Sequence, residues 1–204
     1  MAKIQSVDYE KIPTYAKQIR ADGKEINTQM KNAYNSITEM HSSWYGKRYN
    51  ELVKLFNNMV SDINEMLALV VQQIPYALET VANNYSQADR GSNATAASNE
   101  APSKITAISI SNDVGMKFIT SSVVSVQNSV SANFTKAISE MNSIEASFNQ
   151  IDWNSEAGTA FKAKFKKLKT NLTNSFQDIN KQFKNLMTQA QNDIENAEKS
   201  NTVS

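Results

Sequence analysis

Apolar residues recur at intervals of seven along the first part of the chain. They form two lines, four residues apart, that consist of Ile12, Ile19, Ile26, Ala33 and Met40 and of Ala16, Gly23, Met30, Ile37 and Trp44. Two such lines are typical of a long helix that packs as in a coiled coil. The pattern therefore predicts one continuous helix up to the "WYG" sequence at residues 44–46.

A second apolar seam begins after this turn. Its members are Leu52, Phe56, Met59, Ile63, Met66 or Leu67, Val70, Ile74, Val81 and Tyr85. Two long amphipathic helices joined by a short turn make a helical hairpin. Pro75 lies inside the second helix, where it removes a backbone donor, so we expect a kink or a lost hydrogen bond there.

The region 90–111, "RGSNATAASNEAPSKITAISIS", interrupts the helical pattern. It contains Gly91, Pro102 and many small polar residues, and it has no seam. We interpret it as a linker between a first hairpin (1–89) and a second (112–204), with a short extended piece at 105–110.

The second half repeats the design of the first. Its first helix carries apolar lines that consist of Val123, Val130, Ala137, Ile144 and Ile151 and of Phe134, Met141 and Phe148. A shift of 109 residues places Trp44 on Trp153 and carries the seam from Leu52 to Ile74 onto apolar residues from Phe161 to Phe183. The sequence thus predicts an all-α fold of two hairpins in tandem.

The composition of the chain excludes several kinds of binding partner and metal site. The net charge of +1 gives no general attraction to nucleic acid or to an anionic membrane. The absence of Cys and the single His exclude cysteine or multi-histidine metal sites. His41 precedes the turn, and helical periodicity brings no Ser, Asp or Glu to it, so we interpret it as a turn-surface residue. We predict a protein that is not an enzyme and has no catalytic residues, metal or cofactor.

The two turns carry the most distinctive residues. The first is Trp44-Tyr45-Gly46 and the second is Trp153-Asn154-Ser155. We expect each Trp to cap its seam by packing across the turn. Gly46 lets the backbone turn without a Cβ clash. Ser155 indicates a turn that needs no positive φ, or one whose hydroxyl serves as a helix N-cap.

Trp-x-Gly at the turn of a hairpin of this length resembles the WXG-100 (ESAT-6-like) family, the small proteins exported by type VII (ESX-like) secretion. That family often carries Tyr-x-x-x-Asp/Glu near the end of its second helix as an export signature, which matches Tyr85 and Asp89 here. The shift of 109 residues places a degenerate second signature at Ile194 and Glu198.

The resemblance implies a secreted substrate of a Gram-positive bacterium that pairs its hairpins into an elongated antiparallel four-helix bundle, as an intramolecular pseudo-heterodimer. Trp44 and Tyr85 are about 41 residues apart, roughly 60 Å along a helix. The turn motif and the export signature of one hairpin therefore cannot lie side by side. Antiparallel pairing would instead place Trp44 and Gly46 beside Ile194 and Glu198. It would place Trp153 and Ser155 beside Tyr85 and Asp89.

This pairing requires the linker to return along the bundle. Twenty-two residues reach at most roughly 73 Å, so the linker would lie along the helices rather than hang free. If it cannot reach, the halves pack in parallel or exchange between two chains as a swapped homodimer. We favour a monomer with internal pairing.

The implied partner is the type VII secretion machinery. The first twenty residues lack the apolar core of a signal peptide, so we expect synthesis in the cytoplasm and export, to the medium or cell surface, without a cleaved leader. An alternative is a chaperone or adaptor that holds another secreted protein or toxin. A lower-ranked alternative, a membrane-active helical protein, rests on "MLALVV" at 66–71, which is too short to span a bilayer, and we do not expect membrane contact.

Overall fold

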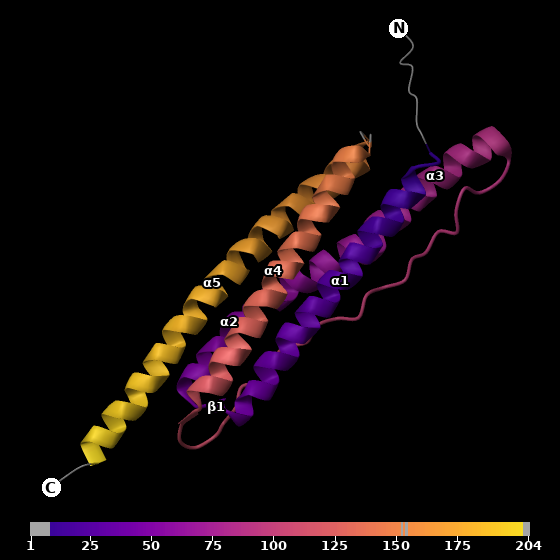
Figure 1. Cartoon of the computed structure of the whole chain (residues 1–204). Helices are drawn as coiled ribbons and strands as arrows, with labels where there is room; N and C mark the ends of the chain where they lie inside the picture. The colour runs from indigo at the N-terminus through magenta and orange to yellow at the C-terminus, as the bar shows by residue number, and fades with distance from the viewer. Residues whose placement is uncertain (1–8, 152, 154, 202–204) are drawn as a thin grey trace. The chain divides into compact units, whose positions relative to one another are not determined.

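The structure is a computed structural model that describes residues 9–151, 153 and 155–201. The long helices are α1 (Ile12–Glu39), α2 (Lys47–Leu67), α3 (Ile74–Arg90), α4 (Thr120–Gln150) and α5 (Glu156–Asn201). The shorter elements are the 3₁₀ helix η1 (Met40–Ser42), the π-helix η2 (Ala68–Gln73) and the strands β1 (Trp44–Tyr45) and β2 (Lys117–Phe118). The fold is an all-α helical bundle, as predicted, apart from this two-stranded pairing (Figure 1).

The predicted seams are the buried faces of α1, α4 and α5. Both lines of α1 are buried, and so are both lines of α4. The α5 seam is buried from Phe165 to Phe183, whereas Phe161 at its start is half-buried. Gly23 lies within the α1 seam, where an added Cβ would come 2.8 Å from Val70 and 2.9 Å from Val71. A side chain larger than hydrogen therefore does not fit between α1 and η2 at this point.

The second helix departs from the predicted register. The π-helix η2 immediately precedes α3, whose second residue is Pro75. A π-turn contains one more residue than an α-turn, so every later side chain moves around the helix axis. Leu78 and Ala82 are the buried apolar positions beyond Pro75. The prediction that the seam continues through Val81 and Tyr85 was wrong, because Val81 is half-buried and Tyr85 is 41% exposed.

Arg20 compensates for the donor that Pro75 lacks. In an α-helix the amide of residue 75 would bond to the carbonyl of Val71, and proline has no amide proton. Arg20 Nε instead donates to that carbonyl at 3.2 Å. The same guanidinium forms a bidentate pair with Glu79 at 2.5 and 2.9 Å. Because Glu79 is buried, this pairing satisfies a charge that would otherwise be costly inside the protein.

The linker is held by side-chain amides and carboxylates of the first hairpin. No strand forms at 105–110; the short strand of this region is β2, at Lys117–Phe118, and α4 begins only at Thr120. Asn57 accepts from the amide of Ile108 at 2.8 Å and donates to its carbonyl at 2.9 Å. Asn50 likewise brackets Ser111: its side-chain amide accepts from the backbone amide of Ser111 at 3.1 Å and donates to its carbonyl at 2.8 Å. The linker therefore lies along the helices, as its limited reach predicted (Figure 1).

The chain divides into two compact units, each of which contains segments of both hairpins. The first unit consists of Met1–Thr28, Asn64–Lys104 and Ala137–Thr170, and the second of Gln29–Ile63, Ile105–Lys136 and Asn171–Ser204. In the first, Phe148 packs edge-on against Phe165 at 5.1 Å, and Lys164 pairs with Glu65 of α2 at 2.8 Å. In the second, Phe134 stacks on Phe176 with ring centroids 4.4 Å apart.

Candidate functional site

Gly46 ends β1 in a backbone conformation that side chains disfavour. Its φ is +112°, in the region where glycine has no steric penalty. A Cβ at this position would also approach the carbonyl oxygen of Gly115 to 3.1 Å. The crowding arises because β1 pairs antiparallel with β2, with Trp44 opposite Phe118 and Tyr45 opposite Lys117. The prediction that Gly46 avoids a Cβ clash at the turn is confirmed.

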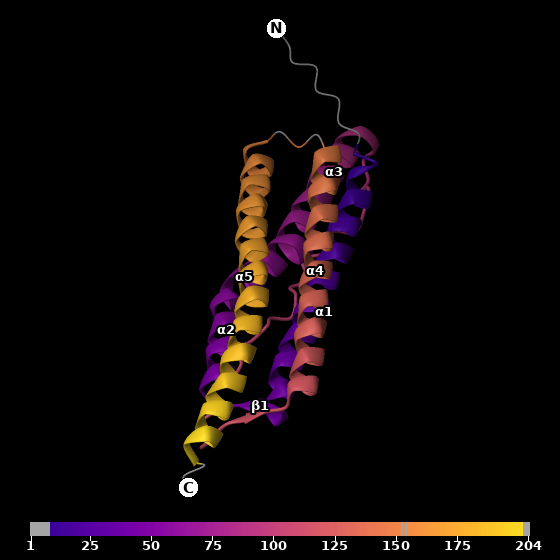
Figure 2. The same ribbon diagram turned by 60° about the vertical axis from the view of Figure 1, so that its left-hand side comes forward.

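Trp44 is almost fully buried among aromatic rings of both hairpins. Its ring lies edge-on to Phe118 at 5.3 Å and stacks on Phe183 of α5 at 5.8 Å. Tyr49 packs against its other side, and burial raises the pKa of Tyr49 to about 12. Figure 2 shows β1 beside the end of the linker and the C-terminal half of α5. The first turn is thus closed by the second hairpin of the same chain.

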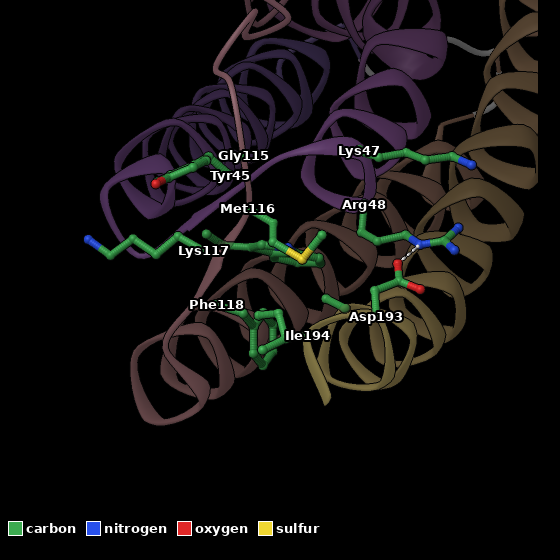
Figure 3. Close-up of a pocket in the computed structure, with 11 residues that line it drawn as sticks. Tyr45, Lys47, Arg48, Gly115, Met116, Lys117, Phe118, Asp193 and Ile194 are labelled. Carbon is green, nitrogen blue, oxygen red and sulfur yellow. Dashed lines mark hydrogen bonds and ion pairs between the residues drawn. The ribbon is translucent and has the colours of Figure 1, made fainter. Parts of the chain in front are cut away.

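A small pocket of about 150 Å³ opens next to this ring cluster (Figure 3). It is lined by residues of the turn, the linker end and α5, namely Trp44, Tyr45, Lys47, Arg48, Gly115, Met116, Lys117, Phe118, Ala190, Asp193 and Ile194. Trp44 and Ile194, which antiparallel pairing would bring together, line the same pocket. The acid at this pocket is Asp193, which accepts from Arg48 Nε at 2.8 Å, whereas Glu198 is exposed and outside the lining.

The second turn is built differently. Trp153 is buried and packs against Phe161 at 5.5 Å, so it also covers the start of its helix. Ser155 Oγ accepts from the amide of Gly158 at 3.1 Å, which is a helix N-cap, and no described non-glycine residue has a positive φ. The interpretation of Ser155 as a helix N-cap is confirmed. Asn154 lies outside the described residues.

Gly158 is a residue of the second turn that sequence reasoning missed. A Cβ there would come 2.5 Å from the carbonyl oxygen of Trp153 and 2.7 Å from its Cγ. The second turn therefore also contains a glycine that no larger residue can replace without a shift, but it lies in the first turn of α5 and is required by Trp153 itself. The available signal was the Ser155-to-Gly158 spacing, which places the glycine three residues after an N-cap.

The proposed export signature lies in the last turns of α3. Tyr85 and Asp89 are four residues apart and therefore share a helix face. Both are exposed, and Gly91 ends the helix with a φ of +66°. Asp89 accepts a hydrogen bond from Tyr9. In α5 the corresponding Ile194 is half-buried and Glu198 is exposed.

His41 has an acidic neighbour that helical periodicity did not predict. Its Nε2 lies 2.5 Å from Asp113, two residues after the end of the linker, and Ser111 donates to the same carboxylate. Helical periodicity brings no acid to His41, as expected; Asp113 reaches it from the non-helical segment before α4, and Ser111 contacts Asp113 rather than His41. Both hydrogen bonds lower the pKa of Asp113. The bond from Ser111 is the largest cause, and the bond with His41 is the second. Ser111 donates to Asp113 rather than to His41, so the group is not arranged as a nucleophile with its base.

Within the described part of the chain, no group of three or more His, Asp and Glu residues is placed to hold a metal ion. Among the same residues, no helix is both long enough and apolar enough to cross a bilayer.

The fold and the turns define a class: helical hairpins of which the first has a Trp-x-Gly turn whose Trp is buried against the second. Residues 5–90 match the WXG100 family model, described as proteins of 100 residues with WXG. The first hairpin is therefore similar to the WXG100 family, and the match does not extend to the second hairpin. Comparison with curated proteins and with solved structures gave no match.

Proposed function

We propose that this protein is a non-enzymatic substrate or effector of a type VII secretion system in a Gram-positive bacterium, exported without a cleaved signal peptide. The observation that carries the proposal is the WXG100 match over residues 5–90, together with the places of its two motifs. Trp44 and Gly46 form the turn, and Tyr85 and Asp89 lie exposed near the end of α3. The machinery would read Tyr85 and Asp89, while Trp44, Tyr45 and Gly46 maintain the turn.

The protein acts as a single-chain pseudo-heterodimer in this proposal. Its modules are residues 1–89 and 112–204, joined by the linker 90–111. The stacking of Trp44 on Phe183 supports internal pairing, because it covers the turn of one hairpin with the other. Fusion raises the effective concentration of the partner hairpin to the millimolar range. The second module, with Asn154 and Ser155 after its Trp and with Ile194 and Glu198 in place of the signature, serves as the partner rather than as a second signal.

Export is tested by comparing culture supernatants of wild type, Tyr85→Ala and Asp89→Ala in a host with an active type VII system. Truncating a recognised aromatic side chain costs roughly 2 kcal/mol or more, which corresponds to about a thirtyfold loss of affinity. We therefore expect secretion of both variants to fall strongly while the amount inside the cells rises.

Tyr76→Ala is the matched control for Tyr85→Ala. Both tyrosines lie on α3 and are similarly exposed, 40% for Tyr76 and 41% for Tyr85. The control should be secreted like the wild type. Normal secretion of Tyr85→Ala and Asp89→Ala, with unchanged helical circular dichroism, would refute the signature.

A second candidate function, an adaptor for another secreted protein, is favoured by one observation. Exposed apolar side chains gather in and after the end of the linker, at Ile110, Val114, Met116, Ile119 and Val124. Exposed apolar patches are typical of protein interaction sites. An adaptor predicts that deleting this protein removes another protein from the supernatant, whereas a simple substrate leaves the rest of the secretome unchanged.

A further inference from the structure

The acid of the proposed signature is already engaged by the beginning of the chain. Tyr9 donates its hydroxyl hydrogen to Asp89 Oδ2, although the two residues are 80 positions apart. Tyr9 lies just before α1, and Asp89 is the penultimate residue of α3. The contact is therefore tertiary, and it joins the two open ends of the first hairpin.

A second pair of residues reinforces this contact. Arg90, which follows Asp89, forms a salt bridge with Glu10, which follows Tyr9. The Arg90 guanidinium carbon also lies 5.5 Å from the centre of the Tyr9 ring, within the range of a cation–π contact. Two adjacent residues of one end thus meet two adjacent residues of the other through three different interactions.

The ionisation of Tyr9 is consistent with this geometry. Its hydrogen bond to Asp89 is the main cause that raises the pKa of the phenol, burial adds to the shift, and Arg90 opposes it. The bond requires the neutral phenol, so it is present at neutral pH and is lost as the pH rises through the elevated pKa. Ionised Tyr9 would face two carboxylates, Asp89 and Glu10, as well as Arg90.

The two members of the signature therefore differ in availability. Tyr85 makes no hydrogen bond to any part of the chain that the structure describes, and its ring is open to a partner. Asp89 accepts from Tyr9 and lies 3.6 Å from Arg90 Nε. A partner that reads both residues finds the aromatic ring free and has to compete for the acid.

We propose that Tyr9, Glu10 and Arg90 form a clasp that occupies Asp89 and that the export machinery must displace. This inference rests on the proposed export function and adds the regulation of its signature. The surface that displaces the clasp would offer an apolar recess for Tyr85 and a hydrogen-bond donor or cation that replaces the Tyr9 hydroxyl on Asp89. Opening the clasp then becomes part of recognition.

The expected effect is small, because every member of the clasp is in contact with solvent. Exposed ion pairs and hydrogen bonds shift an equilibrium by up to about fivefold. The clasp therefore lowers the fraction of molecules that are ready for export without blocking it. Its removal should increase export by about two- to fivefold.

The test is a competition between wild type and Tyr9→Phe, expressed together at low level in one type VII-competent strain. Mass spectrometry gives the ratio of the two proteins in the medium, divided by their ratio in the cells. Phenylalanine retains the ring and removes the hydroxyl, so we expect a value of about two to five in favour of Tyr9→Phe. Tyr15→Phe, at a half-buried position on α1, is the control and should give a value near one.

A value of one or below for Tyr9→Phe would overturn the clasp. Repeating the competition with Asp89→Asn in both chains should abolish the advantage, and an advantage that persists would also overturn it. Asp89→Ala alone separates the two proposals: if it is secreted normally, the export signature fails and the clasp fails with it. If Asp89→Ala is retained in the cells while Tyr9→Phe gives no advantage, only the clasp is wrong.

A physical measurement tests the contact independently of secretion. Spectrophotometric titration of the tyrosines should show, besides buried Tyr49, a second phenol with a raised pKa that is absent in Tyr9→Phe. Asp89→Asn should lower that pKa again, because the carboxylate is its main cause. A Tyr9 phenol that titrates identically in the wild type and in Asp89→Asn would contradict the clasp.

Discussion

Two glycines accommodate the two tryptophan turns, and they do so for different reasons. Gly46 is needed mainly for its positive φ, and only the motif around Trp44 pointed to it in the sequence. Gly158 is needed because the carbonyl and indole of Trp153 occupy the space of a Cβ. Sequence reasoning paired Gly46 with Ser155 and missed Gly158, because a close approach between side chain and backbone leaves no periodic signal.

Replacing Gly158 by Ala should destabilise the protein. The added methyl overlaps backbone and ring atoms of Trp153, which typically costs about 1–3 kcal/mol, although Ala favours the helix by up to about 1 kcal/mol. We expect a net loss of roughly 1 kcal/mol or more in the free energy of unfolding, measured by urea denaturation. Thr159→Ala, an exposed neighbour in the same helix, should stay within about 0.5 kcal/mol of wild type. A Gly158→Ala protein as stable as the wild type would show that Trp153 moves aside without strain.

At the scale of elements, heptad spacing was sufficient to predict α1, α4, most of α5 and the hairpin turns. Heptad spacing did not predict which face of α3 is buried. The π-helix rotates the later side chains about the helix axis, and the sequence after it gives no sign of that rotation. Pro75 indicated a break in the helix, but the size of the register change depends on how α1 meets η2 at Gly23. The asparagine brackets of the linker were also not predictable, since a polar residue on a helix surface looks the same with or without a tertiary partner.

The bracket at Asn57 can be tested directly. Asn57→Ala removes both hydrogen bonds to Ile108 and leaves a buried isoleucine attached to a freer backbone. Two lost hydrogen bonds should cost about 1–3 kcal/mol of stability. Hydrogen–deuterium exchange of the segment around Ile108 should become faster, whereas the adjacent exposed Asn58→Ala should leave it unchanged. Equal exchange in the two variants would show that the Asn57 bracket does not hold this segment.

For the whole molecule, the central claim is that the two hairpins pair within one chain. The sequence predicted a repeated hairpin and a linker of limited reach. The individual contacts between the hairpins could not be predicted, because the residues that make them lie far apart along the chain. They are Arg48 with Asp193, and Trp44 with Phe118 and Phe183. Each compact unit draws on both hairpins, so separating the halves would leave neither unit complete.

The most direct test uses the absence of cysteine from the chain. Arg48→Cys and Asp193→Cys, introduced together, place the only two thiols on α2 and α5 at the pocket beside Trp44. A short bismaleimide, added to dilute protein, should then link them within one chain. Denaturing electrophoresis and mass spectrometry should show a cross-linked monomer, and each single-cysteine variant should show none. A covalent dimer as the main product, or no cross-link at all in the folded double variant, would contradict internal pairing.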